Sequence, residues 1–571
     1  MRSKSLHMTL LAMLSIAVYA NALGGKFVWD DEAQIVKNES IRAIGNIPHA
    51  FATGLWSYEK TQSDANRYYR PLVTVIYALT YQLGGLSPFA YHVVNLLLHV
   101  VASLLVYLLL LELEFERFAS LFAAGLFAVH PVHSEAVSWI AGLGDVACAV
   151  FYFTALLAAV RYLKRRHKAW LVMAIMSLLA ALFSKEMAVT FPLVTFLVFR
   201  MTGLHLNVRQ SVAAVFPYIL VLGAYLITRV AAIGTTLPAT FKEHATLLDW
   251  LTLAVWMFGK YIRYTVLPYP LSGLHLTPLY FHDRILSTLG YALVAVAALA
   301  LTVFLTRRTT RNAFLWFGVF AAMLIPVFYF KGITGGFIFA ERYLYIPTLP
   351  AVALASLIVM RLPRRLAGIT VVAVIAALSA GTVIRNRDWK DNESFFASST
   401  RVYPENAFAW LGLADTSLNE GNNSLAERSY EMAQQHITDE RFIVLPNSEY
   451  RLHLGLGTLA AYNNMSEAAK KHLVRALEID PAGGDAYTIL AAVLANLDGN
   501  PEAAIPLLQK AIELNPLNDQ ARDSMGVALF RLRRVDEAIL YFLAALQINP
   551  QNELAKQHLQ TARRALELQK Q

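Results

Sequence analysis

The sequence is poor in cysteine and in charge. Its 571 residues include one cysteine, Cys148, and only 16% of them are charged, whereas 56% are hydrophobic. A single thiol excludes a disulfide framework within the chain and a zinc site built from several thiolates. The scarcity of charge and the excess of apolar side chains exclude a disordered chain, a collagen and an ordinary cytosolic enzyme. The composition therefore indicates a membrane protein.

The small basic excess has to be interpreted by its location. Lys and Arg number 49 against 40 Asp and Glu, which gives a net charge of +9. In a soluble protein such a balance would point to nucleic acid. Here the cations cluster between apolar runs, so the expected partner is the lipid bilayer and no nucleic acid is expected.

The chain changes composition at about residue 387. Residues 1–387 predict an all-α polytopic bundle of about eleven spans, and residues 388–571 predict polar helical repeats. A spanning helix needs about 20 residues, so several of the shorter runs must borrow flanking residues. The apolar runs are 7–23, 90–111, 118–130, 146–163, 169–183, 187–199, 211–231, 287–305, 313–330, 344–360 and 366–383.

The first run and the basic clusters set the expected topology. Arg2 and Lys4 before an apolar core also fit a signal peptide, but ten further spans favour an uncleaved anchor. Basic clusters mark the cytoplasmic side. With eleven spans all of them fall on one side, provided that 251–267 is interfacial or re-entrant. The C-terminal half then lies outside the cytoplasm, beyond the inner membrane if the source is bacterial. The clusters are 2–4, 161–168, 200–209, 307–311 and 361–365.

The C-terminal half repeats itself with a period of about 34 residues. Prolines recur at Pro481, Pro516 and Pro550. Small residues at fixed places let two antiparallel helices approach closely, and the proline ends the second helix of each unit. This is the tetratricopeptide pattern. The expected repeats are 407–440, 450–483, 485–518 and 519–552, followed by a capping helix, 553–571. The recurring small residues include Gly457, Ala492 and Gly526.

Three adjacent carboxylates, Asp30, Asp31 and Glu32, follow the first apolar run in a loop that spans 24–89. This loop is too long for a mere connector. The carboxylates can supply a general base, bind a divalent cation or form a solvated helix N-terminus. Aromatic and branched neighbours favour a functional role, because a partly desolvated Asp is a better base than a hydrated one. The loop closes on Arg70 and on an apolar stretch, 71–83, which we expect along the outer surface.

Two histidines lie at an outer membrane boundary, His130 and His133, with Glu135 and Asp145 after them. Two histidines three apart with a carboxylate resemble metal-ligand spacing, but Pro131 indicates a helix start and no second ligand group is evident. We therefore favour hydrogen bonding to sugar hydroxyls or to phosphate over a metal site.

Two further motifs place ionisable residues near the membrane on the outer side. Lys185 and Glu186 lie between two apolar runs, and Arg342 and Tyr343 precede another. Burying such groups without compensation costs several kcal/mol, so they are either functional or joined in internal ion pairs. Together with Lys260 and Arg263 in the 251–267 segment, these cations can hold a lipid phosphate at the interface.

In this order, and followed by the repeats, the motifs resemble the transmembrane and tetratricopeptide repeat O-mannosyltransferases and their prokaryotic relatives. The resemblance covers nearly the whole chain. It is carried by 27–31 (FVWDD), 69–72 (YRPL), 91–99 (YHVVNLLLH), 127–137 (FAVHPVHSEAV), 184–186 (SKE) and 341–345 (ERYLY).

The resemblance implies a C-type glycosyltransferase, which moves a sugar from a polyprenyl-phosphate donor and carries an acidic catalytic motif in its first extracytoplasmic loop. It implies a mannose-like hexose, no bound metal, and an acceptor protein held by the repeats. Asp30 matches the position that takes the proton from the acceptor hydroxyl, with Asp31 beside it. The residues expected to bind substrate or donor are Arg70, His130, His133, Glu135, Asp145, Lys185, Glu186, Lys260, Arg263, Arg342 and Tyr343.

Two other functions fit parts of the sequence. A membrane-anchored tetratricopeptide scaffold would need only one span and would leave the acidic loop without a role. A ligase or polymerase of lipid-linked glycans usually depends on a large late loop, whereas here the longest loop comes first. Transport has little support, because the sequence shows no inverted repeat.

Overall fold

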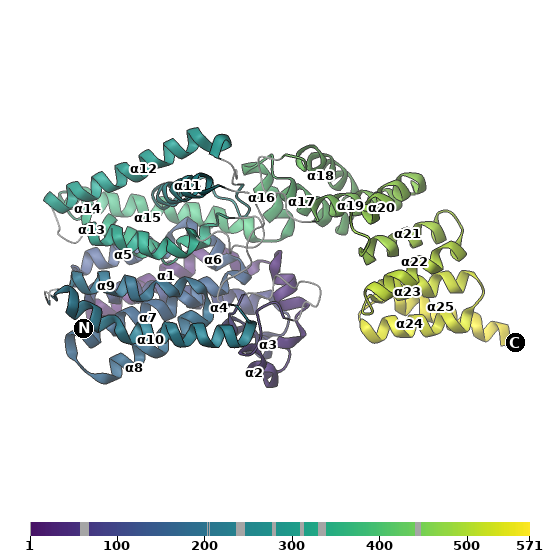
Figure 1. Cartoon of the computed structure of the whole chain (residues 1–571), viewed down its shortest axis with the longest axis horizontal. Coiled ribbons are helices and arrows are strands. Elements are labelled where there is room, and N and C mark those ends of the chain that lie inside the picture. Colours follow the sequence, from purple (N-terminus) through teal and green to yellow (C-terminus); the bar gives the residue numbers. More distant parts are fainter. Residues whose placement is uncertain are drawn as a thin grey trace. The chain divides into compact units, whose positions relative to one another are not determined.

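The computed structural model describes residues 2–57, 68–202, 204, 206–235, 246–276, 281–308, 313–328, 338–439 and 447–570. Within these ranges all regular secondary structure is helical. The chain forms two compact units, which divide between Tyr403 and Pro404. This boundary lies after the change in composition near residue 387, because the helix Asn392–Val402 belongs to the first unit. We call the first the membrane unit and the second the repeat unit (Figure 1).

Each of the eleven apolar runs contains a helix. The helices of the membrane unit that correspond to them are α1 (Arg2–Tyr19), α4 (Pro88–Glu112), α5 (Arg117–Val129), α7 (Leu143–Arg165), α8 (Lys168–Ser184), α9 (Phe191–Met201), α10 (Val208–Ile233), α12 (Phe281–Arg308), α13 (Ala313–Leu324), α14 (Thr348–Val359) and α15 (Arg364–Asn386). The helices between and after them are α2 (Ile47–Ala50), α3 (Pro71–Gly84), α6 (Ser134–Ser138), α11 (Leu247–Val266) and α16 (Asn392–Val402).

Six helical segments of the described chain are long and apolar enough to cross a bilayer. A helix such as α4, with 25 residues, extends about 37 Å at ~1.5 Å per residue, which exceeds a hydrocarbon core of about 30 Å. Four more apolar helices, among them α5 and α8, are shorter. The six segments are Lys4–Gly24, Pro88–Glu112, Ile140–Arg165, Val208–Ile233, Arg284–Phe304 and Arg364–Trp389.

The spanning candidates differ in how deeply they lie in the bundle. The central helix α7 packs against α4 and α8. In its apolar stretch 89% of the residues are buried, whereas only 11% are buried in the apolar stretches of α12 and α15. Leu286 and Leu293 of α12 and Ile369 and Val372 of α15 are exposed apolar side chains. Exposed apolar surface on this scale needs a nonpolar solvent. The chain is therefore an integral membrane protein in which α12 and α15 face lipid.

The two surface segments expected from the sequence are also helical. The 71–83 stretch forms α3, which begins at Pro71, and the 251–267 stretch lies in α11. The first turn of α11 is fixed by reciprocal hydrogen bonds between Thr246 and Asp249, and Leu247 is exposed there while Lys260 is buried. Neither helix is among the six spanning candidates.

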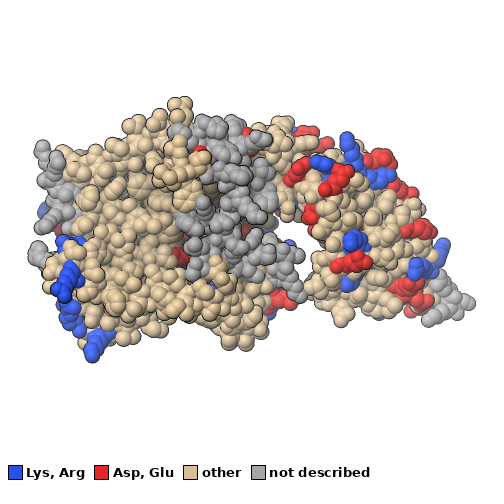
Figure 2. Space-filling view, in the orientation of Figure 1, with Lys and Arg blue, Asp and Glu red and all other residues tan. Residues whose placement is uncertain are grey.

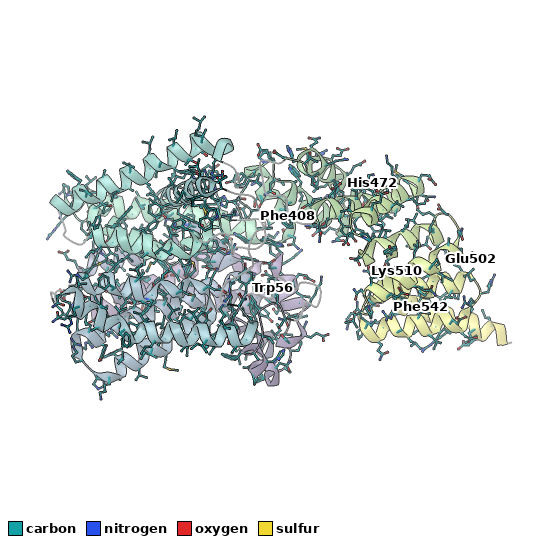
Figure 3. The ribbon with its side chains drawn as sticks, viewed as in Figure 1. Trp56, Phe408, His472, Glu502, Lys510 and Phe542 are labelled. Carbon is teal, nitrogen blue, oxygen red and sulfur yellow. The ribbon has the colours of Figure 1, made fainter. Side chains whose placement is uncertain are left out.

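The repeat unit consists of antiparallel helix pairs and a final helix (Figure 1). They are α17 (Ala407–Asn419) with α18 (Asn423–His436), α19 (Ser448–Tyr462) with α20 (Ser466–Ile479), α21 (Gly484–Asn496) with α22 (Pro501–Leu514), α23 (Asp519–Arg531) with α24 (Val535–Ile548), and α25 (Glu553–Lys570). In two of the pairs a glycine of the first helix faces a large residue of the second. Gly457 faces Leu473, and Gly526 faces the buried Phe542, which Figure 3 labels together with the exposed Glu502 and Lys510 of α22.

We expect Gly526→Ala to destabilise the repeat unit. A Cβ atom at this position would overlap the Phe542 ring, and that ring is 1% exposed and has no room to move. Overpacking costs about 1–3 kcal/mol and exceeds the ~1 kcal/mol that Ala gains over Gly in a helix. Gly484→Ala is the control, because its Cβ would meet its nearest neighbours at 3.7 Å and 3.9 Å. Thermal unfolding of the full chain in detergent should show a lower transition for the first variant only.

Candidate active site

The acidic loop lies at the end of the membrane unit that also carries α3, α6 and α16 (Figure 1). Asp31 is 1% exposed, and its carboxylate accepts hydrogen bonds from the backbone N–H groups of Val28 (2.8 Å) and Ala141 (2.7 Å). Burial raises the pKa of the Asp31 carboxyl, although these two donors act in the opposite direction. Asp30 is only partly buried. Of the two residues expected to be catalytic, Asp31 therefore anchors the loop and Asp30 is the accessible one.

Trp29 fixes the backbone just before Asp30. Its φ of 53° lies in the left-handed region, which costs a non-glycine residue about 1 kcal/mol or more. Its N–H donates to Oδ1 of Asn392 (2.8 Å), and its ring stacks on Trp139 at 5.8 Å and on Phe395 at 5.6 Å between ring centroids. Asn392 and Phe395 belong to α16, so the first turn of this helix holds the acidic loop in place.

Arg342 brings a cation next to this aromatic stack. Its side chain forms an ion pair with Glu135 of α6, and its backbone N–H donates to the same carboxylate (2.8 Å). The guanidinium lies 5.4 Å from the centroid of the Trp139 ring, which stacks on the rings of Trp29 and Trp389. Trp139 thus connects Arg342 to the residue that precedes Asp30.

Lys185 is the second cation at the site. Its amine lies 2.5 Å from the Asp145 carboxylate in the first turn of α7 and 5.2 Å from the centroid of the Tyr343 ring. Burial lowers the pKa of Lys185 to about 8, partly opposed by Asp145, and the nearby Arg70 and Arg342 lower it further. The ammonium is therefore charged at neutral pH and is close to both arginines.

Arg70 is the third cation. It precedes α3 and makes two hydrogen bonds, of 2.8 Å and 3.0 Å, to one oxygen of Glu186. Arg229 of α10 lies 3.4 Å from the other oxygen. Burial alone would raise the pKa of Glu186, but the two arginines lower it below its usual value. We call Arg70, Lys185 and Arg342 the cation cluster.

Lys260 and the side chains around it lie next to the cation cluster, because Glu341, which contacts this group, directly precedes Arg342 in the chain. Glu341 accepts hydrogen bonds from Ser272 N–H (2.6 Å) and His275 (2.8 Å). The Lys260 amine lies 4.3 Å from the centroid of the Trp256 ring and 4.2 Å from that of Phe339, a cation–π arrangement. Arg263 is partly exposed on the same helix, α11, with its guanidinium 4.4 Å from the centroid of the Tyr264 ring.

The two histidines are directed elsewhere. His130 donates to the carbonyl of Thr265 (3.0 Å) and His133 to that of Phe127 (2.9 Å). The His133 ring lies 4.5 Å from that of Tyr345, in the core of the bundle. The structure therefore brings Glu135 and Asp145 to the cation cluster but holds both histidines by backbone contacts.

Several residues that shape this site were not predicted from the sequence. Trp139 and Asn392 carry no local signal, because their contacts to the acidic loop are distant in sequence. Arg229 did carry a local signal, because an arginine inside the apolar run 211–231 indicates a buried partner. That partner is Glu186.

This arrangement has the parts needed for transfer from a phosphate leaving group. An accessible carboxylate can take a proton, and neighbouring cations can stabilise a developing phosphate anion. Until such an anion binds, the carboxylates of Glu186, Asp145 and Glu135 neutralise Arg70, Lys185 and Arg342.

Comparison with known proteins identifies distant relatives of this chain. The chain is 24% identical over 604 aligned residues to the protein O-mannosyl-transferase TMTC3 of Mus musculus, covering 95% of this chain and 64% of that protein. It is 27% identical to the O-mannosyl-transferase F38B6.6 of Caenorhabditis elegans, covering 74% and 62%. It is 37% identical to Tmtc1 of Drosophila melanogaster over 177 residues, covering 31% and 21%. The chain thus spans less than two thirds of the length of these relatives.

The repeat unit has its own matches. The tetratricopeptide repeat family model matches residues 454–518 and 497–553. Among solved structures, the chain is similar to YrrB, a TPR protein with an unusual peptide-binding site, at 20% identity and a TM-score of 0.23, covering 29% of this chain and 80% of that one. The MamA protein matches at 25% identity and a TM-score of 0.22, covering 28% and 81%. Together with the repeats, the alignments over most of the chain show that it is a distant homologue of the TMTC-type protein O-mannosyltransferases.

Proposed function

We propose that this protein is a membrane glycosyltransferase that moves a mannose-like hexose from a polyprenyl-phosphate donor to hydroxyl groups of extracytoplasmic proteins. The observation that carries the proposal is the position of Asp30, an accessible carboxylate connected through Trp29 and Trp139 to Arg342 of the cation cluster. The homology to O-mannosyltransferases over 95% of the chain supports the same reaction class.

The proposed reaction is a displacement at the sugar C1 carbon. Asp30 takes the proton of the acceptor hydroxyl as its oxygen attacks C1, while the bond from C1 to the phosphate oxygen breaks and its electron pair leaves with the lipid phosphate. The anion develops beside Arg70, Lys185 and Arg342. An arginine has five N–H donors, so Arg342 can keep Glu135 and still donate to a phosphate. Asp31 keeps Asp30 in place and does not exchange a proton.

The topology that suits this reaction has eleven spans with α11 at the interface. Lys and Arg side chains gather at the end of the membrane unit where α7 ends and α8 begins, and the candidate site lies at the other end (Figure 2). Because basic residues mark the cytoplasmic side, the candidate site faces outward. The repeats, which follow the last span, then lie on the same outer side and bind the acceptor protein.

The test is sugar transfer in membranes. Vesicles with the wild-type chain and vesicles with the empty vector receive radiolabelled polyprenyl-phosphate mannose or glucose, and the label that enters protein is counted. Incorporation that depends on the chain and on one of the donors is the expected result. Equal incorporation with and without the chain, for both donors, would contradict the proposal and favour a scaffold.

We expect transfer to survive removal of divalent cations. Each oxygen of Asp31 already accepts a backbone hydrogen bond, from Val28 or Ala141, so the carboxylate has fewer lone pairs to offer a cation. Among the described residues no group of three suitable side chains can hold a metal ion. The initial rate in EDTA should stay within about twofold of the rate in Mg²⁺. A loss that Mg²⁺ or Mn²⁺ restores would show that a metal participates.

A further inference from the structure

The repeat unit contains a groove of about 1020 Å³ along the first helices of its pairs. Residues of α17, α19, α21 and α23 line it, together with the start of α25, so it runs past all of the repeats. Its apolar lining includes Leu454 and Ile489, which are only partly buried. A surface that is continuous over several repeats suits an extended chain rather than a compact ligand.

The charged side chains of this groove are almost all acidic. Its only cation among the described lining residues is Arg451, which is bound to Asp415 at 2.6 Å. Asp519 accepts hydrogen bonds from the amides of Asn549 and Asn552, at 2.9 Å each, and neutral donors leave its charge in place. Asp485 is exposed in the first turn of α21. The acidic lining residues are Asp415, Asp485, Asp519, Asp523 and Glu553.

Amide side chains supply the second kind of contact. Asn419 at the end of α17 and Asn496 at the end of α21 both line the groove and are exposed. Each amide can donate to a backbone C=O and accept from a backbone N–H, which recognises a peptide without regard to its side chains. Specificity is then left to charge, and like charges across an interface disfavour the wrong partner.

From the groove, its amides and its charge we infer that the repeats bind an extended peptide segment rich in lysine or arginine. Combined with the proposed function, on which this step rests, the acceptors would be proteins with basic residues near their hydroxyl side chains. An acidic acceptor segment would be repelled mainly by Asp485 and Asp519, since Asp415 is paired with Arg451, Glu553 with Lys556, and Asp523 accepts a hydrogen bond from His558. The inference thus names the charge class of the acceptor.

Binding can be measured apart from catalysis. The full chain is placed in nanodiscs of zwitterionic lipid, and fluorescence anisotropy follows three labelled peptides of about 12 residues, about 40 Å when extended. They share Ser and Gly positions and differ in carrying Lys, Gln or Glu elsewhere. We expect the Lys peptide to bind at least tenfold more tightly than the Glu peptide at low salt, with the difference shrinking as salt screens the charges.

Two charge reversals locate the effect. Asp485→Lys changes the groove, and Asp536→Lys changes the first turn of α24, outside the groove lining. Both aspartates are exposed near a helix N-terminus, so the two variants alter helix energetics and total charge alike. The first should weaken binding of the Lys peptide about three- to tenfold and the second should change it less than twofold. Thermal unfolding of both variants checks that the repeat unit is folded.

The outcomes separate the inference from the proposed function. Equal affinity for the three peptides, or equal losses in the two variants, would overturn the basic-segment inference even if sugar transfer is observed. Selective binding of the Lys peptide without any sugar transfer would support the groove and leave the membrane unit without the proposed activity.

Discussion

Replacing Asp30 by Asn is expected to lower the initial rate of sugar transfer by a factor of about 10²–10⁴, the usual contribution of a general base. The amide has nearly the shape of the carboxylate but cannot accept the proton of the acceptor hydroxyl. Because Asp30 is only partly buried, the change should leave the fold intact. Transfer of label in membranes with matched amounts of protein measures the rate.

Asp31→Asn is the matched comparison, since it makes the same chemical change one residue away. Asp31 is buried and accepts from two backbone N–H groups. An amide has one oxygen, so one of these donors would lose its acceptor at a cost of about 1–3 kcal/mol. We therefore expect Asp31→Asn to lower the unfolding temperature and Asp30→Asn to keep it. If Asp30→Asn kept the wild-type rate, Asp30 would not be the base.

The different roles of Asp30 and Asp31 could not be predicted from the sequence pattern. The pattern Asp30-Asp31 marks an acidic motif after the first span, but by itself it does not distinguish the two residues, and only the family resemblance assigned the proton to Asp30. The structure distinguishes them because the N–H of Ala141, 110 positions along the chain, meets the Asp31 carboxylate. A contact at such sequence separation leaves no periodicity or spacing by which it could be predicted.

The helices and repeats were easier to predict because their signals are local. Each apolar run from 7–23 to 366–383 contains a helix, and the period of about 34 residues coincides with the helix pairs of the repeat unit. Six of those runs are long enough to span, so the count of eleven spans stays a prediction. Run length says which segments are apolar, whereas burial and neighbours decide how each crosses the membrane.

The ion pairs of the site could be predicted in part. Ionisable residues near membrane depth indicated internal pairing as an alternative to function, and the structure pairs Arg70 with Glu186, Lys185 with Asp145, and Arg342 with Glu135. All six of these residues were predicted from the sequence, but none of the pairings was. His130 and His133 were grouped with Glu135 by proximity in sequence, but their rings are directed to backbone carbonyls, because the short turn at Pro131 sends neighbouring side chains in different directions.

Lys185→Met is expected to lower the free energy of unfolding by about 3–5 kcal/mol, the typical cost of removing one partner from a buried ion pair. Lys185 and Asp145 are 4% and 5% exposed and lie 2.5 Å apart, so the substitution leaves a carboxylate in the core without its cation. Denaturant-induced unfolding in mixed micelles, followed by tryptophan fluorescence, measures the change.

The double variant Lys185→Met with Asp145→Asn should recover most of that stability, because neither charge is then buried alone. Its catalytic activity is expected to stay low, since the phosphate anion would still lack one of the cations of the cluster. This combination separates the two roles of Lys185. If the double variant recovered both stability and sugar transfer, Lys185 would serve only to neutralise Asp145. If neither recovered, the amine would be required for the fold through contacts other than Asp145, of which the ring of Tyr343 is the nearest candidate.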